Sequence, residues 1–403
     1  MMLLFAIFAA GGSSAESTAS LLPGSTDENV SKLVKSNNAT GLDLYSKLRT
    51  KKGNIVISPY SIGTAMTMAL AGADGGTAKE MSAVMHQNLA YKKMNTAAGD
   101  LYKKLNSLNS KDITLETANG LCLVKPDLVS SFYKNLLRKY YFAELFSAKN
   151  VKPVNDWVND KTHGKIPEIL NTFPGNTLCV ILNAIYFKGL WASQFKKTST
   201  FDADFFLEDG KKIKTPMMHQ SGKFPMTKNN DFSALEMPFK GKRLSFIIIL
   251  PGKGAKLADF EKTFDMSKAT SIIAALKKNK KPAKVDIAVP KFKIDYDTEL
   301  KPPFMQLGMK EAFSAKLADF GKLTGVKNRP GLVWIAQIKH KAFIEINEEG
   351  GEAAAATAVV MTLRCASVSK SFTADRPFLF LIKDTATDSI LFLGRVANPQ
   401  IGK

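Results

Sequence analysis

The residues that could carry catalysis or bind a metal are few and scattered. The four histidines, His86, His163, His219 and His340, lie far apart in the 403-residue chain. The sequence has no H-E-x-x-H zinc motif, no G-x-S-x-G nucleophile turn and neither of the glycine-rich loops that bind phosphate. We therefore expect no metal site, no cofactor and no enzymatic activity.

One segment has a composition suited to a change of conformation. Residues 348–365 read EEGGEAAAATAVVMTLRC. The alanines favour helix, the β-branched residues after them favour strand, and Gly350 with Gly351 supplies a hinge. As a strand, the segment would place an uncharged row on one face, made of Gly351, Ala353, Ala355, Thr357, Val359 and Met361. The segment is predicted to exist in two states, although composition also allows an ordinary exposed loop or a short helix.

The surrounding patterns predict a mixed helix and sheet fold. Ser58-Pro59 predicts the start of a helix over 60–71, and Thr77-x-x-Glu80 predicts a capping box for the next helix. The alternation from Trp334 to Ile346 predicts a strand with one buried face, with His340 on that face. Apolar runs predict strands at 177–187 and 244–250 and an antiparallel pair at 377–382 and 390–396.

Four motifs in this order resemble one known family, the serpins. They are NIVISPYSI at 54–62, VNDKTHGKI at 158–166, NAIYFKGLW at 183–191, and RPFLF at 376–380 with FLGRV at 392–396. The resemblance extends from about Val30 to Pro399, and it is greatest to the secreted inhibitory serpins of arthropods. It implies an α+β serpin fold with about eight to nine helices packed on three sheets. The chain is then one domain over 16–403, with an exposed reactive-centre loop at about 348–372.

The resemblance also implies a bait function for the loop. Family spacing counts seventeen residues from Glu348 to the residue whose carbonyl a protease attacks, and here that residue is Arg364, followed by Cys365. A protease that accepts arginine has a carboxylate at the base of its S1 pocket, so the expected target is trypsin-like. A shift of one residue would place Leu363 at the cleaved bond and suggest a chymotrypsin-like target.

In this family the cleaved loop inserts as an extra strand and traps the protease as an acyl-enzyme. The hinge that begins this movement matches Glu348, Glu349, Gly350, Gly351, Glu352, Ala353, Ala354, Ala355 and Ala356. Gly351 departs from the usual Thr or Ser and loses more backbone entropy on becoming a strand. A non-inhibitory serpin, acting as a carrier or a cleavable substrate, is therefore the alternative. The sheet-opening gate of the family matches Ser58, Ser61, Asn183 and His340, and Trp191 matches the site where insertion begins.

The charge balance is strongly basic, with 56 Lys and Arg against 36 Asp and Glu and a net charge of +20. The densest run ends a predicted helix and predicts heparin or another glycosaminoglycan as a partner; it contains Lys277, Lys278, Lys280 and Lys281. A less favoured candidate flanks an earlier helix, at Lys92, Lys93, Lys103 and Lys104. The sequence lacks the aromatic residues among basic ones that are typical of nucleic-acid binding, so nucleic acid is not expected as a partner. We expect a monomer that does not insert into membranes.

The N-terminus predicts export. Residues 1–15 have the short apolar run and the small residues of a signal peptide that is cut before Glu16, so the protein is expected to be secreted. The three cysteines include no close pair, and Cys122 and Cys179 lie in apolar runs typical of buried free thiols. Two N-x-S/T sequons predict glycosylation at Asn29 and, less strongly, at Asn38.

Overall fold

The computed structural model of the chain describes residues 27–173, 175, 177–278, 283–351 and 370–400. Within these residues, ten α-helices and three 3-10 helices accompany sixteen strands in three sheets, so the expected α+β class is confirmed. The count is slightly above the eight to nine that the resemblance implies, and three of the ten helices, α7, α9 and α10, have only six, six and four residues.

The described helices fall mainly in the first half of the chain. They are α1 (Asp27–Leu48), α2 (Pro59–Gly72), α3 (Gly75–Val84), α4 (Tyr91–Asn106), α5 (Ser131–Tyr141), α6 (Lys152–Lys161), α7 (Leu257–Lys262), α8 (Met266–Lys278), α9 (Lys301–Gln306) and α10 (Gly321–Thr324). The 3-10 helices are η1 (Pro126–Leu128), η2 (Lys197–Ser199) and η3 (Glu311–Phe313).

The central sheet has six strands in the order β11 (Phe292–Glu299), β12 (Lys339–Ile346), β13 (Gly350–Gly351), β4 (Cys179–Leu190), β2 (Ile113–Leu123) and β3 (Glu144–Ser147). A second six-stranded sheet has the order β1 (Ile55–Ile57), β16 (Ile390–Val396), β15 (Phe378–Asp384), β9 (Leu244–Pro251), β8 (Phe232–Pro238) and β7 (Met226–Lys228). The third sheet contains β14 (Lys370–Thr373), β10 (Ala283–Pro290), β6 (Lys212–Phe224) and β5 (Thr200–Phe206).

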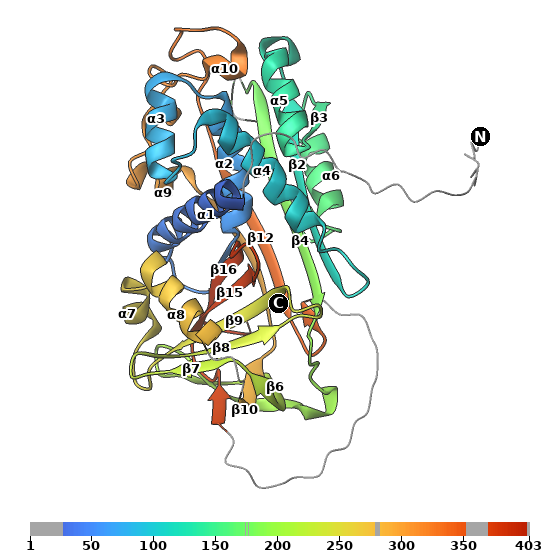
Figure 1. Cartoon of the computed structure of the whole chain (residues 1–403), viewed down its shortest axis with the longest axis vertical. Helices are drawn as coiled ribbons and strands as arrows, with labels where there is room; N and C mark the ends of the chain where they lie inside the picture. The colour runs from blue at the N-terminus through green and yellow to red at the C-terminus, as the bar shows by residue number, and fades with distance from the viewer. Residues whose placement is uncertain (1–26, 174, 176, 279–282, 352–369, 401–403) are drawn as a thin grey trace, which may run out of the picture.

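The helices and sheets separate along the long axis of the molecule. Figure 1 shows α1 to α6 with α9 and α10 in the upper half, and β6 to β10 with β14 in the lower half. The long strands β4 and β12 run through the middle and connect the two halves.

The strand predictions from apolar runs are confirmed. β9 is buried along its whole length, and β15 pairs antiparallel with both β9 and β16 in the middle of the second sheet. Helix α2 begins as predicted, because the Ser58 hydroxyl accepts the Ser61 N–H and Pro59 occupies the first helical position.

Two local predictions are wrong. Helix α3 is capped by Asp74, while Thr77 and Glu80 instead accept hydrogen bonds from backbone N–H groups of residues 310–319. The predicted strand from Trp334 to Ile346 begins only at Lys339, where pairing with β11 starts. Side-chain periodicity indicates which residues face the core, but a β-strand also requires hydrogen bonds to the backbone of a neighbouring strand.

The two sequons lie on α1 with their side chains turned inward. Asn38 is 3% exposed; its amide donates to the Asp388 carbonyl and accepts the Ile390 N–H. The hydrogen bonds of Asn38 leave no room for a glycan on it in this fold, and Asn29 is 7% exposed. Glycosylation at the two positions stays a prediction.

Cys122 and Cys179 are free thiols, as predicted. Burial raises the pKa of Cys122 to about 11 and that of Cys179 to about 12. In the part of the chain that the structure describes, no helix is long and apolar enough to cross a membrane.

Candidate functional site: the hinge and the central slot

The beginning of the two-state segment is already a strand of the central sheet. Gly350 and Gly351 form β13, which pairs antiparallel with Leu190 and Gly189 of β4 on one side and with Ile346 of β12 on the other. The glutamates before them, Glu348 and Glu349, are buried. The hinge is therefore inserted at one end of the gap between β4 and β12.

The backbone of the hinge is held by several hydrogen bonds. The indole N–H of the buried Trp191 donates to the Asn347 carbonyl at 2.9 Å, and the Trp191 backbone N–H donates to Glu349 at 2.8 Å. The Asn347 side chain accepts the N–H groups of Glu349 and Gly350. Together these contacts keep the first hinge residues in one position.

Each hinge carboxylate is paired with a lysine. Glu348 lies 3.0 Å from the amine of Lys291, and Glu349 lies 3.0 Å from that of Lys197. Burial raises the pKa of Glu348, but the hydrogen bonds from Lys291, a backbone N–H and Thr200, together with the Lys291 charge, outweigh it, so the pKa lies below its usual value. Each buried hinge carboxylate thus lies beside a partially exposed lysine.

A close approach of the backbone requires glycine at 350, whereas the contact at 351 is only tight. Gly350 has φ +150°, and a Cβ on it would lie 1.8 Å from the Gly189 carbonyl oxygen. A Cβ on Gly351 would lie 3.2 Å from the Phe187 ring. The glycine at 351 therefore lets the hinge lie closely against β4 before any cleavage.

Beyond Gly351 the central sheet has a slot. Among the described residues no backbone pairing joins β4 to β12, which are connected only through β13. The residues of β4 that alternate on one face are half-buried rather than buried, and these are Cys179, Ile181, Asn183, Ile185 and Phe187. This exposure is expected where a neighbouring strand is missing.

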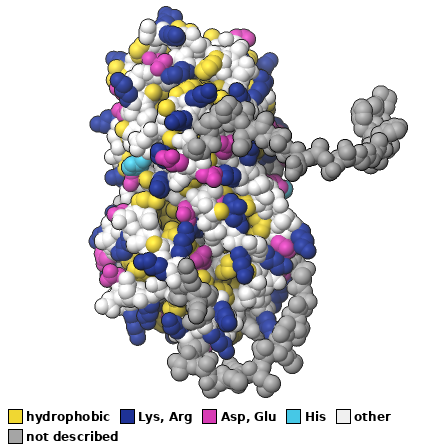
Figure 2. Space-filling view, in the orientation of Figure 1, with side chains coloured by type: hydrophobic (Ala, Val, Ile, Leu, Met, Phe, Trp, Pro, Cys, Tyr) yellow, Lys and Arg dark blue, Asp and Glu magenta, His cyan; other side chains and the backbone are white. Residues whose placement is uncertain are grey.

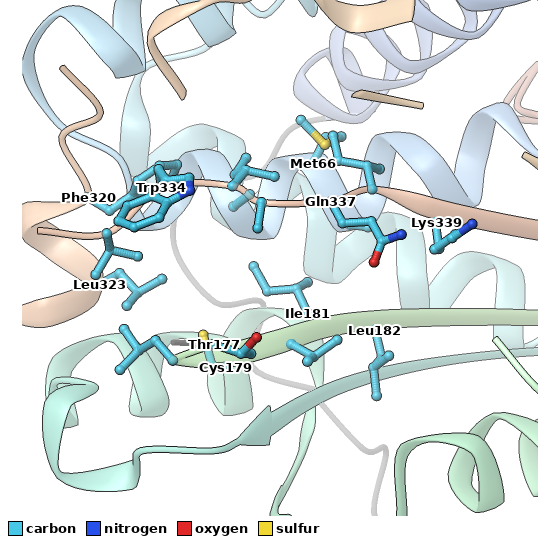
Figure 3. Close-up of a pocket in the computed structure, with 18 of the residues that line it drawn as sticks. Met66, Thr177, Cys179, Ile181, Leu182, Phe320, Leu323, Trp334, Gln337 and Lys339 are labelled. Atoms are coloured by element: carbon cyan, nitrogen blue, oxygen red, sulfur yellow. The ribbon is translucent and has the colours of Figure 1, made fainter. Parts of the chain in front are cut away.

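The far end of the slot widens into an apolar groove of about 560 Å³. Figure 3 shows Trp334 and Phe320 at one end of the groove, opposite Thr177 and Cys179 of the β4 side. Helix α2 contributes Met66. Two edges with unpaired backbone and an apolar floor form a site suited to an added β-strand.

His340 lies beside this groove and is bonded to the start of α2. Its Nε2 accepts the Ser58 N–H at 3.2 Å, and the Ser58 hydroxyl in turn accepts the Ser61 N–H. Burial lowers the pKa of His340 from its ordinary 6.5 to about 4. The ring is therefore neutral, with its proton on Nδ1.

Asn183 faces the same groove from β4, but its side-chain amide hydrogen-bonds to Asn119 on β2 and not to the Ser58–His340 pair. Its amide donates to the Asn119 side chain at 2.6 Å, and Asn119 donates to the Tyr141 carbonyl. The Asn183 Oδ1 is buried without a hydrogen-bond partner among the described residues. The structure thus joins Ser58, Ser61 and His340 directly, places Asn183 across the slot, and places Trp191 at the hinge.

Comparisons with known proteins agree with this architecture. A profile described as "Serpin (serine protease inhibitor)" matches residues 35–399. The chain belongs to the serpin family. It is 36% identical to Iris of Ixodes ricinus, over 88% of this chain and 96% of that protein. It is 35% identical to leukocyte elastase inhibitor of Xenopus tropicalis, over 89% of this chain and 97% of that protein.

Among solved structures, native protease nexin-1 with heparin superposes with a TM-score of 0.78 at 26% identity. The superposition covers 92% of this serpin and 99% of that chain. The family expected from the four motifs is confirmed, as is its serpin fold. The family model is described as that of serine protease inhibitors, which are not catalytic enzymes, and the solved structures similar to this chain also include human thyroxine-binding globulin, at 27% identity and a TM-score of 0.81.

Several predicted site residues of this serpin lie outside the described residues. They are Glu352, Ala353, Ala354, Ala355, Ala356, Arg364 and Cys365 of the loop, and Lys280 and Lys281 of the lysine run. Residues 1–15 also lie outside them. Among the residues that are described, no group of three or more His, Cys, Asp or Glu side chains is placed to bind a metal.

The described lysines of the two predicted heparin regions differ in their surroundings. Lys277 is 2.8 Å from Asp388, so part of its charge is offset, while Lys278 is exposed. In the earlier region Lys104 pairs with Asp27 and Lys103 lies over the Phe142 ring. Figure 2 shows Lys and Arg spread over the visible face with acidic side chains among them.

Sequence reasoning missed the residues that hold the hinge. Asn347 follows the apolar strand directly, a position where asparagine commonly closes a turn, and this signal could have identified it. Lys197 and Lys291 are distant in sequence and resemble any other surface lysine. Only the fold brings them to Glu349 and Glu348.

Proposed function

We propose that this serpin is a secreted inhibitor of trypsin-like serine proteases that uses Arg364 as bait. The protease serine attacks the Arg364 carbonyl, the peptide bond to Cys365 breaks, and the released segment inserts into the slot. The protease, still attached as an ester, is displaced before water completes hydrolysis. The observation that supports this proposal most is that the hinge glycines are already paired in the central sheet, at one end of the slot between β4 and β12.

The register of β13 supports insertion of the following residues. Gly351 lies opposite Gly189 and Ile346, so a continued antiparallel strand would place Thr357 opposite Asn183 and His340. The alanines between them would pass the half-buried Ile185 and Phe187, where small side chains avoid crowding. The strand would supply the backbone partners that both edges of the slot lack.

Trypsin tests this proposal directly. An inhibitor gives an SDS-resistant adduct near the summed mass of the two proteins, whereas a carrier or a simple substrate gives only a nicked band. Sequencing the released peptide identifies the bond, since an N-terminus at Cys365 supports Arg364 and one at Arg364 would indicate Leu363. We expect Arg364→Leu to slow the reaction with trypsin at least ~100-fold, because the S1 carboxylate loses its cation.

Heparin binding at the end of α8 is proposed as a property of the same inhibitor. Native protease nexin-1, which shares the fold, crystallised with heparin, and in the present chain Lys278 is exposed at the start of the lysine run. Retention on heparin-agarose beyond that on a plain cation exchanger of equal charge would support it. Equal retention on the two resins would contradict it.

Secretion is tested by expression in cells with a secretory pathway. We expect the protein in the medium with Glu16 as its first residue, because residues 1–15 resemble a signal peptide. Retention inside the cell with Met1 intact would contradict this part of the proposal.

A further inference from the structure

Lysines without an acidic partner gather at one end of the third sheet. Lys223 of β6 and Lys284 of β10 lie directly opposite each other in the antiparallel register, and both are exposed. Lys370, the first residue of β14, is exposed too, but it lies opposite the buried Val285 and so starts on the other face of the sheet. We call Lys223 and Lys284 the basic strip. Neither forms an ion pair with a described residue.

The opposite end of the same sheet is built differently. Lys212 and Lys214 of β6 both lie within 3.2 Å of Asp204 on β5. At the strip, by contrast, two like charges face each other across the strands, which is destabilising. Asp286 is exposed two residues farther along β10. A repulsive pair at one end of a sheet whose other end is balanced indicates that the charge serves contact with another molecule.

Lys370, which begins the strand next to the basic strip, is close in sequence to the predicted bait residue. Arg364 is six residues before Lys370, so an extended chain limits their separation to about 20 Å. A protease of ~220 residues has a radius of gyration of about 17 Å. An enzyme bound at Arg364 must therefore come close to the strip. Figure 1 shows β6, β10 and β14 together at the lower end of the molecule, away from α3, α5 and α10.

We propose that the basic strip is a second contact surface for the target protease and selects enzymes with acidic residues beside the active-site cleft. This proposal rests on the proposed function and specifies its partner. Opposite charges on the two surfaces accelerate encounter and discriminate against enzymes of the wrong charge. The bait residue then selects the S1 pocket, and the strip selects among enzymes that share that pocket.

Anionic and cationic trypsin provide the test, since both cleave after arginine but carry opposite net charge. The rate constant for loop cleavage is measured with each enzyme at 50 and 300 mM NaCl. This rate is defined whether the protein traps the protease or is merely cut. Formation of the SDS-resistant adduct is scored separately, so failure of inhibition is distinguished from failure of the strip.

The variant Lys223→Glu/Lys284→Glu is compared with Lys310→Glu/Lys316→Glu. The control changes the net charge equally, at exposed lysines that follow α9 in the upper half of Figure 1. Circular dichroism spectra and urea midpoints of the variants establish that each is folded. A milder variant, Lys223→Gln/Lys284→Gln, serves if the glutamates prevent folding.

We expect the natural protein to react about tenfold faster with anionic than with cationic trypsin at 50 mM NaCl, and the difference to shrink at 300 mM. The strip variant should lose this preference, while the control retains it within about twofold. Equal effects of both variants would mean that only net charge matters and would overturn the proposal. Loss of heparin-agarose retention without any change in the trypsin rates would make the strip a polyanion site, which also overturns it.

Discussion

His340 should make the native state sensitive to acid between pH 6.5 and pH 4. The ring is buried and accepts a hydrogen bond from the Ser58 N–H, so protonation would place two donors against each other. Burial lowers its pKa to about 4, and no neighbouring charge contributes to this shift. The unfolded chain binds a proton at about pH 6.5, whereas the native state resists it until about pH 4.

The sign and size of the effect follow from these two values. A depressed native pKa contributes stability that is complete above pH 6.5 and is lost as the pH falls toward 4. The full loss is about 3.4 kcal/mol, of which about 2 kcal/mol has been lost at pH 5. Over most of this range the native ring stays neutral and the loss comes from protonation of the unfolded chain; the contact between β12 and the start of α2 itself weakens only as the pH approaches 4.

The assay compares the natural protein with His340→Gln. The free energy of unfolding is measured by urea denaturation from pH 7.5 to pH 4.5, with Trp191 fluorescence as the probe in a Trp157→Phe/Trp334→Phe background. Glutamine can accept the same N–H but does not titrate. Subtracting the two curves therefore cancels every other titrating group and leaves the contribution of His340.

We expect the difference between the two proteins to change by about 2 kcal/mol between pH 7.5 and pH 5. The rate of spontaneous conversion to an inactive, loop-inserted form should rise only as the pH approaches 4, where the native ring gains its proton, and in the natural protein only. Parallel stability curves together with equal conversion rates would refute the role assigned to His340.

Three further predictions concern the hinge and the thiols. Lys291→Met leaves Glu348 buried without its cation, and we expect a loss of about 1–2 kcal/mol of unfolding free energy in urea, since the exposed lysine limits the effect; an unchanged midpoint would contradict the role of this pair. Gly350→Ala places a Cβ against the β4 backbone and should expel the hinge, so a glutamate-specific protease should cut at 348–352 at least ~10-fold faster; an unchanged rate would show that the hinge tolerates the methyl. In a Cys365→Ser background, the buried Cys122 should react with Ellman's reagent at pH 8 at least ~100-fold more slowly than in urea, because burial raises its pKa to about 11, and the half-buried Cys179 should react faster than Cys122; rapid native reaction of both thiols would contradict the burial of Cys122.

Much of the site was predictable because it depends on local chemistry. The two glycines and the alanine-rich run identify a hinge followed by a segment that suits either of two conformations. The position of the bait arginine follows from counting along the chain once the family is recognised. His340 was placed on a buried face by the alternation of its neighbours alone.

The same local reasoning failed where a distant segment decides the outcome. Thr77 and Glu80 have the spacing of a capping box, but residues 310–319 supply better-placed donors and Asp74 takes over the cap. The sequence around Asn38 likewise does not show that residues 388–390 bind its amide in the core. Neither partner can be identified from a short window of sequence.

The sequence by itself determined most of the elements and the two hinge glycines, because backbone preference and side-chain alternation act over a few residues, while the bait at Arg364 stays a prediction from family spacing. Only the tertiary structure decided that Gly350 and Gly351 are already inserted, that Lys291 and Lys197 hold the hinge glutamates, and that a slot separates β4 from β12. These features depend on backbones and charges that are far apart in the chain and meet only in the folded sheet. The strand predicted from Trp334 illustrates this. Its side-chain alternation begins at Trp334, but the strand itself begins only at Lys339, where the backbone of β11 pairs with it.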